Sequence, residues 1–235
     1  FKSSDEGRAM MQIIHDVAPG AELKFHTATA SPRQFEVGFK ALADCDIIVD
    51  DITFITEPFF STTGRIAQEI KSFVGSPVKF HFTSAGNVAN KAYQKRFSTS
   101  SNLPVTNFIP NGDPTRAHVF GSNENGSEDY LQEISVVPGT YLIALQWKEG
   151  LASQINSLGA TDDLDIYVVD DLGRLLVGSN RVNIAGDPTE IIVFRSTGTG
   201  TANLLITSAN GPTDVPFRYI AFRTTAGDGT PDGLI

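Results

Sequence analysis

The sequence contains little cysteine, tryptophan or methionine, and it has no long apolar run. Among 235 residues there are one Cys, one Trp and two Met. The single thiol, Cys45, excludes an internal disulfide, and we interpret it as a buried thiol rather than a nucleophile. No segment is long and apolar enough to predict a transmembrane helix, and no signal peptide is recognisable.

Basic residues are also scarce. The chain has 18 Lys and Arg against 27 Asp and Glu, a formal net charge of -9. This balance argues against nucleic acid or an anionic membrane as a partner. The four histidines have no zinc-ligand spacing, and no glycine-rich phosphate loop is present. With 40% hydrophobic and 19% charged residues, the composition is that of a globular protein.

Residues 1–91 alternate between helix and strand patterns. Met10, Ile13, Ile14 and Val17 have the i, i+3, i+4, i+7 spacing of a helix with one apolar stripe. Such alternation predicts an α/β domain, namely a parallel sheet with helices on both faces. The predicted helices cover about 5–17, 32–43 and 62–73, and the predicted strands cover 22–28, 47–49 and 78–82.

The pattern changes near residue 92. From 92 to 225, short alternating segments are separated by turns rich in Asn, Gly, Asp and Pro. Regular short strands with such turns predict an all-β sandwich or jelly roll. We therefore expect a partial α/β domain over 1–91, an inserted β-sandwich over 92–225, and a return to the α/β domain over 226–235.

Glu6 lies on the same helical face as the apolar stripe, four residues before Met10. One interpretation is a capping box, with Ser3 as the N-cap and Glu6 reaching back to the Ser3 amide. The other is a catalytic carboxylate at a helix N-terminus. Spacing alone does not choose between them.

Two polar groups follow predicted strands. Asp50 and Asp51 close the strand at 47–49, and Thr83-Ser84-Ala85-Gly86-Asn87 follows the strand ending at Phe82. In open parallel sheets, sites form beyond the carboxyl ends of strands. Asn87 could donate to a developing oxyanion there. Ordinary turns and caps are the alternative for both groups.

These stretches resemble segments of the subtilase and sedolisin serine peptidases. Glu6 to Ala21, including Val17-Ala18-Pro19-Gly20, resembles the helix that carries the catalytic base. Residues 47–52 resemble the strand lining the substrate groove, and 83–87 resemble the oxyanion turn. This chain has Glu6 where subtilisins have His. It has Met10 where sedolisins have Asp.

The resemblance implies site roles. Glu6 would be the general base, assisted by Asp5, and Asn87 the oxyanion donor, while Asp51, Ser84 and Gly86 would contact substrate. The nucleophilic Ser would lie outside this chain. We therefore expect these 235 residues to be inactive alone, as part of a secreted or cell-surface endopeptidase acting on peptide or protein.

The second segment resembles the pre-peptidase C-terminal β module of secreted bacterial peptidases, through residues 161–170 and 186–190. Asp162, Asp163 and Asp165 could supply oxygen ligands to Ca²⁺. The alternative is that they are solvated turn carboxylates. Two further functions stay open: an inactive pseudo-peptidase, or a β-sandwich module that binds protein or glycan.

Overall fold

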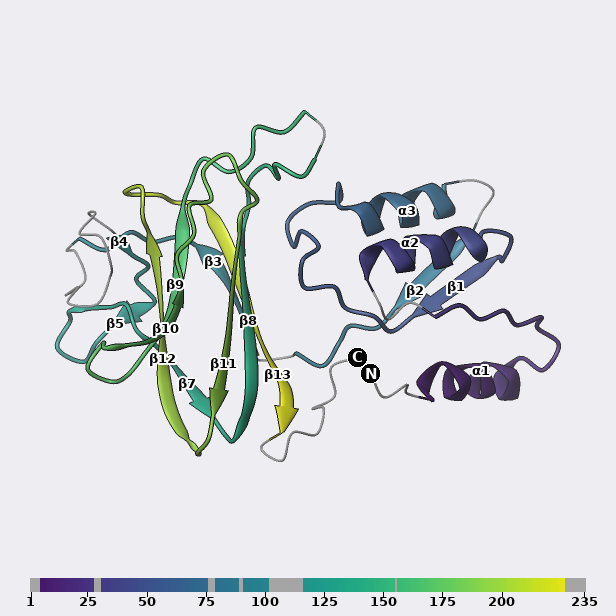
Figure 1. Ribbon diagram of the computed structural model, residues 1–235, viewed down its shortest axis with the longest axis horizontal. Coiled ribbons are helices and arrows are strands. Elements are labelled where there is room, and N and C mark those ends of the chain that lie inside the picture. The colour runs from purple at the N-terminus through teal and green to yellow at the C-terminus, as the bar shows by residue number, and fades with distance from the viewer. Residues whose placement is uncertain are drawn as a thin grey trace. The chain divides into compact units, whose positions relative to one another are not determined.

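The chain divides into two compact units (Figure 1). The first contains Phe1–Glu57 and Thr62–Gly86, and the second contains Pro58–Ser61 and Asn87–Leu234. The computed structural model describes residues 5–27, 31–75, 79–88, 91–101, 116–154 and 156–226. The predicted cap Ser3, and residues 227–235 of the predicted return segment, lie outside them. In these ranges, no helix has the length and apolar character needed to cross a membrane.

Over its described residues, the first unit contains three helices and one pair of strands. Ser31 caps the second helix by accepting a hydrogen bond from the Gln34 amide at 3.2 Å, and Pro32 follows at the first turn. The two strands are parallel, with Ile48 opposite His81. The elements are α1 (Glu6–Val17), α2 (Pro32–Ala41), β1 (Ile47–Asp50), α3 (Arg65–Val74) and β2 (Phe80–Thr83).

A small aromatic core joins α2, α3 and one face of the strand pair. Phe39 packs edge-on against Phe73 at 5.5 Å between ring centroids, and Ile48 completes the cluster. Figure 1 shows α2 and α3 together on one face of the strand pair β1 and β2, the face that carries Ile48. The opposite face of the pair is apolar and open, since Ile47 is 53% exposed and Phe82 56%.

The predicted parallel sheet with helices on both faces is therefore wrong. In the described part of the chain the parallel sheet has two strands, and all other strand pairs are antiparallel. The predicted strand at 22–28 does not form over its described residues, 22–27. Phe25 instead lies against α1, so closely that a β-carbon on Gly7 would come within 2.3 Å of its ring.

Helix α1 forms where the spacing predicts it, but its apolar stripe is not buried. None of its residues is buried, and Ile13 and Val17 remain 64% and 83% exposed. Periodicity therefore identified the helix but not a partner for its apolar face.

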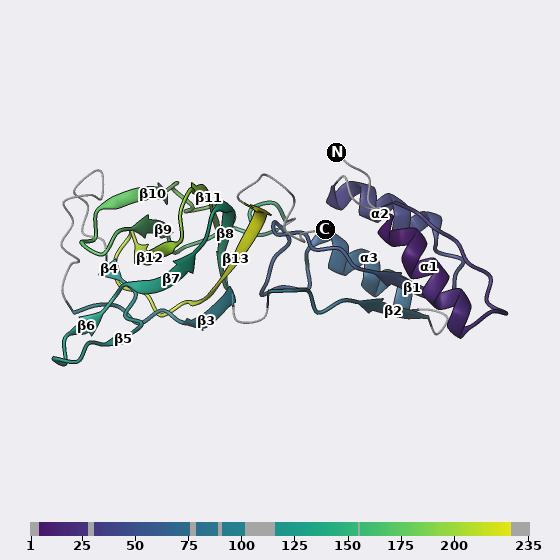
Figure 2. The same ribbon diagram turned by 90° about the horizontal axis from the view of Figure 1, so that it is seen from below.

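The second unit is a β-sandwich of two antiparallel sheets (Figure 2). One sheet has the order β10-β9-β12-β4, with β7 also paired to β12, and the other has the order β11-β8-β13-β3. A two-stranded hairpin, β5 with β6, lies outside them. The strands are β3 (Ala92–Arg96), β4 (Arg116–Ala117), β5 (Gly121–Ser122), β6 (Glu128–Asp129), β7 (Gln132–Val136), β8 (Gly139–Trp147), β9 (Leu164–Val169), β10 (Leu175–Ser179), β11 (Thr189–Ser196), β12 (Gly200–Ser208) and β13 (Pro216–Ala226).

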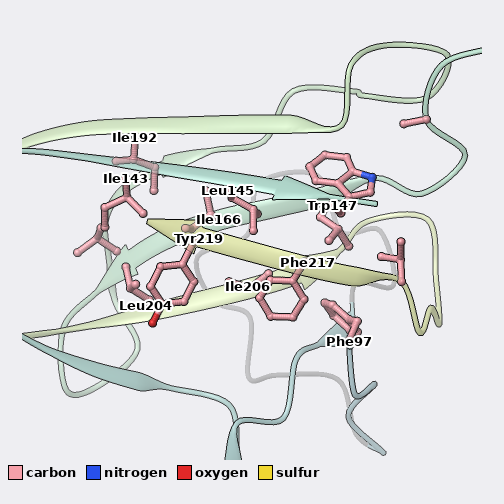
Figure 3. Packing of buried hydrophobic residues seen from close by; sticks show 14 of the residues in the cluster. Phe97, Ile143, Leu145, Trp147, Ile166, Ile192, Leu204, Ile206, Phe217 and Tyr219 are labelled. Atoms are coloured by element: carbon pink, nitrogen blue, oxygen red, sulfur yellow. The ribbon is translucent and has the colours of Figure 1, made fainter. Parts of the chain in front are cut away.

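Alternate residues of both sheets fill the space between them (Figure 3). Ile143, Leu145 and Trp147 of β8 face Ile166 of β9 and Ile206 of β12, and each is at most 1% exposed. Period-two alternation places every second side chain in this core. The core holds the strand ends in place, and the loops between them form the candidate site.

Candidate functional site

Three loops meet at one end of the sandwich, the upper end in Figure 1. We refer to this end as the loop end. They connect β8 to β9 (148–163), β10 to β11 (180–188) and β12 to β13 (209–215). Antiparallel pairing brings them together, because Trp147 pairs with Phe217 and Ser208 pairs with Leu164. Loops held by a rigid sandwich are common positions for binding residues.

The first two loops run side by side. The Ala160 amide donates to the Gly186 carbonyl at 2.9 Å, and the Ala185 amide donates to the Ala160 carbonyl at 2.8 Å. Gly159 has φ +77°, and a β-carbon there would lie 2.4 Å from the Ala185 carbonyl carbon. Glycine is therefore required for the two backbones to approach this closely.

Side chains tie the third loop to the other two. The Asp163 carboxylate accepts from the Asn183 amide at 2.9 Å. Asn210 accepts from the Asp163 amide at 3.0 Å and donates to the Thr161 carbonyl at 2.8 Å. These hydrogen bonds link the three loops to one another.

Glu149 anchors the base of this surface. Its carboxylate accepts from the Trp147 indole at 2.9 Å and from the Thr161 and Asp162 amides at 3.0 and 2.9 Å. Burial raises the pKa of Asp162, and the negative charges of Glu149 and Asp214 raise it further. The carboxylates of Glu149, Asp162 and Asp214 therefore lie near one another at this end of the sandwich.

An aliphatic patch lies on the same paired loops. Leu158 is 91% exposed, Val182 81% and Ile184 44%. Ile184 forms an isolated bridge with Ala160, so the two loops that carry these side chains are adjacent. An exposed apolar patch beside polar groups is typical of an interaction site. We refer to Leu158, Val182 and Ile184 as the aliphatic patch.

A buried acidic cluster lies beneath the loops. Asp165 accepts from the Tyr167 hydroxyl at 3.1 Å, and burial with the charge of Asp163 raises its pKa to about 8. Burial also raises the pKa of Glu190, whose carboxylate accepts from the Ser179 hydroxyl and from Arg181. Carboxyl groups this well buried favour the neutral form.

The predicted Ca²⁺ candidates Asp162, Asp163 and Asp165 all lie in this region. Asp163 and Asp165 are buried, not solvated turn carboxylates. The Asp163 oxygen already accepts a backbone amide, and that of Asp165 a phenol. Across the described ranges no three His, Cys, Asp or Glu side chains are grouped so as to hold a metal ion.

The predicted catalytic residues lie on the surface. Asp5 precedes α1 and forms an ion pair with Arg8, its side chain 73% exposed, and makes no side-chain cap. Glu6 is half-buried at the first position of α1. Their assigned roles stay predictions.

The predicted oxyanion and substrate residues are in a turn and a strand end. Ser84, Gly86 and Asn87 are exposed, and Gly86 has φ +71°, as a tight turn requires. Asp51 is half-buried directly after β1. Asn87 falls in the second unit, whereas the other three fall in the first. Their roles also stay predictions.

The neighbouring carboxylate, Asp50, does form a cluster. It accepts from His81 Nε2 at 2.5 Å and from the Thr83 hydroxyl at 2.8 Å, and the His81 side chain is 9% exposed. Asp50 pairs with Thr83 in register, so these contacts join β1 to β2. The arrangement suits a structural link between parallel strands.

Several residues of the loop end were not predicted from the sequence. Asn183 and Asn210 link the loops, and Glu190 is fully buried on an edge strand. The one available signal was Glu190 itself, because a carboxylate at an inward-facing position of an apolar strand needs a polar partner. Asparagines in turns carry no such signal.

No protein-family model matches the chain, and no curated protein matches it. Solved structures that match include the lectin domain of lectinolysin complexed with Lewis B antigen, at 11% identity and a TM-score of 0.27 over 60% of this chain and 99% of that chain. A fucose-binding module of Streptococcus pneumoniae matches at 11% identity and a TM-score of 0.24, over 56% of this chain and 90% of that chain. A β-glucosidase from Kluyveromyces marxianus in complex with glucose matches at 12% identity and a TM-score of 0.29, over 94% of this chain and 32% of that chain. At these scores the likenesses carry no argument.

The assignment to the subtilase and sedolisin peptidases, with its inserted pre-peptidase module, is wrong. The first unit has one two-stranded parallel sheet in the part described. No family model supports the assignment. The motifs misled because each is short: Val17-Ala18-Pro19-Gly20 ends a helix, and Ser84 to Asn87 forms a glycine turn, as in many folds.

Proposed function

We propose that the second unit is a binding module whose loop end binds a neutral saccharide. The observation that supports this is the aliphatic patch on the same paired loops as Asp162 and Asp187, both half-buried carboxylates. A sugar ring has apolar C–H faces and hydroxyl donors. Aliphatic side chains can pack on the faces, and carboxylates accept from the hydroxyls.

The charge of the loop end narrows the ligand class. The three loops carry five acidic residues against two basic ones: Glu149, Asp162, Asp163, Asp187 and Asp214 against Lys148 and Arg181. The excess of negative charge repels phosphate, sulfate and sialic-acid carboxylate groups. Neutral hexoses and deoxyhexoses are therefore favoured over anionic glycans. The likenesses to sugar-binding modules add no weight at their TM-scores, so the proposal depends on the loop end alone.

The test compares two exposed leucines at opposite ends of the sandwich. The full chain is screened against immobilised neutral saccharides, and the strongest ligand is measured by calorimetry. Leu158→Ser should weaken binding about tenfold, because a leucine buried against the ligand contributes roughly 1.5–3 kcal/mol. Leu172, 77% exposed in the turn between β9 and β10, is the matched control. Leu172→Ser should bind normally. Equal loss in both variants, or no neutral ligand at all, contradicts the proposal.

Two earlier predictions stay open beside this one. Peptidase activity of a longer protein is a prediction that Glu6→Gln and Asn87→Ala would test there by turnover. Location outside the cell is compatible with saccharide binding and is likewise a proposal.

A protein ligand at the aliphatic patch is the second candidate function. A saccharide and a basic protein would differ in how strongly salt weakens their binding.

A further inference from the structure

The outer face of the sheet β11-β8-β13-β3 is covered rather than open. On β8 and β13 the residues that alternate with the core residues point outward, and Ala144, Ile220 and Phe222 among them are 0%, 8% and 3% exposed. Ala144 pairs with Ile220, so these side chains are cross-strand neighbours. An outward face this well buried needs an occupant.

A segment remote in sequence contacts this face. Pro58–Ser61 belongs to the second unit although it precedes β3 by some thirty residues. The Phe59 amide donates to Gln146 Oε1 at 2.7 Å, and the Arg218 guanidinium lies 5.7 Å from the centre of the Phe59 ring. Gln146 and Arg218 are paired across β8 and β13, so both contacts fall at one position on the sheet.

The contacts have the character of peptide recognition. Gln146 is only 3% exposed, so its hydrogen bond to a main-chain amide is a buried one. A cation over an aromatic ring selects the side chain that follows Pro58. Arg218 Nε is buried, and within the part of the chain that the structure describes it has no hydrogen-bond partner.

We infer that this outer face is a docking site for a short turn segment carrying an aromatic residue after proline, and that Pro58–Ser61 occupies it as an internal ligand. The internal segment keeps the site filled in the intact chain. A peptide of the same sequence, supplied separately, binds when Phe59 is removed. This site is on a sheet face, so it is independent of the saccharide proposed for the loop end.

The experiment uses the full chain and a fluorescent peptide with the sequence of residues 55–63, followed by anisotropy. Wild-type protein should bind it weakly. Phe59→Ala should bind at least about tenfold more tightly, because its own segment no longer competes for the ring site. The same peptide with alanine in place of the first phenylalanine should not bind Phe59→Ala. Val193→Ala, at a 57% exposed position of β11, is the control and should behave as wild type.

Folding is monitored by thermal unfolding, and Phe59→Leu provides a second variant that keeps a large apolar side chain but loses the cation–π contact. Phe59→Leu should bind the peptide more tightly than wild type. Adding Gln146→Leu to either variant should abolish the gain, because it removes the amide acceptor. Failure of both folded Phe59 variants to bind the peptide, or equal binding by Val193→Ala, overturns the inference.

Discussion

Gly159 and Ala185 determine how closely the two paired loops approach. Both have positive φ, +77° and +59°, but only one of them is glycine. A non-glycine residue in this region costs roughly 1–2 kcal/mol because its β-carbon crowds the carbonyl. Gly159 is therefore a required glycine, whereas Ala185 is a strained alanine. Substituting alanine at the first position and glycine at the second should change the free energy of unfolding in opposite directions.

We expect Gly159→Ala to lower the free energy of unfolding by at least about 2 kcal/mol, since it adds backbone strain to a 2.4 Å clash with Ala185. Ala185→Gly should raise it by about 0.5–1 kcal/mol, because it relieves strain against a modest entropic cost. Urea unfolding measures both. A stabilised Gly159→Ala variant would contradict the close backbone approach.

Asp165 makes stability depend on pH. Its pKa rises from 3.8 in the unfolded chain to about 8 in the folded one, through burial and the charge of Asp163. The folded state therefore binds the extra proton between these values, and stability falls as pH rises from about 4 to about 8. The raised pKa values of Asp163 and Glu190 act in the same direction.

Asp165→Asn should flatten this dependence, because asparagine is neutral at every pH and still accepts from Tyr167. At pH 8 the variant should be more stable than wild type by at least about 1 kcal/mol. Urea unfolding at a series of pH values measures the slope. A wild-type protein that gains stability from pH 5 to pH 8 relative to the variant would show that Asp165 is ionised when folded.

At the scale of elements, β1 and β2 are joined by side chains as well as by the ladder. Asp50 accepts from His81 and Thr83 in a largely buried position, and its side chain is 11% exposed. Removing one partner of a buried hydrogen bond leaves the others unsatisfied. The pair has no third strand among the described residues, so it depends on these contacts more than a wide sheet does.

Asp50→Leu should therefore destabilise the first unit by about 2–3 kcal/mol, since the His81 side chain, 9% exposed, loses its acceptor, whereas the exposed Thr83 hydroxyl can bond water instead. Asp44→Leu is the control, because Asp44 forms an exposed ion pair with Lys24. That variant should leave the unfolding midpoint unchanged. Histidine NMR signals from His81 report the first unit directly. An equal shift in both variants would argue against the Asp50 cluster.

Sequence periodicity predicted elements better than it predicted partners. The strands of the sandwich alternate clearly, and turns such as Asn125-Gly126 separate them, so the β-sandwich could be anticipated. The run Ile47-Ile48-Val49 suggested burial on both faces, yet Ile47 and Val49 are exposed. A local pattern shows which side chains of a strand are apolar. Whether they are buried depends on the strands and helices that pack against them, and these come from segments far away in sequence.

The candidate site was least predictable for the same reason. Asp162, Asp163 and Asp165 were recognisable because they are adjacent, but their partners Asn183, Glu190 and Asn210 come from other loops and strands. Phe59 lies 87 residues before Gln146, its hydrogen-bond partner. Such contacts depend on topology, which a single sequence without relatives does not reveal.

At the scale of the whole molecule, net charge separates the two candidate ligands of the loop end. The chain carries a formal charge of -9, and some of its carboxylates lie in the loops that carry the aliphatic patch. A neutral saccharide forms no ion pairs, so salt does not screen its binding. A basic protein or peptide would be attracted by the field, and its association would weaken as salt shortens the screening length from about 10 Å at 0.1 M to about 3 Å at 1 M.

We therefore expect the affinity for the saccharide to change less than about twofold between 0.05 and 0.5 M sodium chloride. Calorimetry at four salt concentrations measures this, with Leu158→Ser included to show that the same site is observed. A partner whose affinity falls more than about tenfold over this range binds through charge. In that case the acidic carboxylates, rather than the aliphatic patch, select the ligand, and the loop end would be a site for a basic protein.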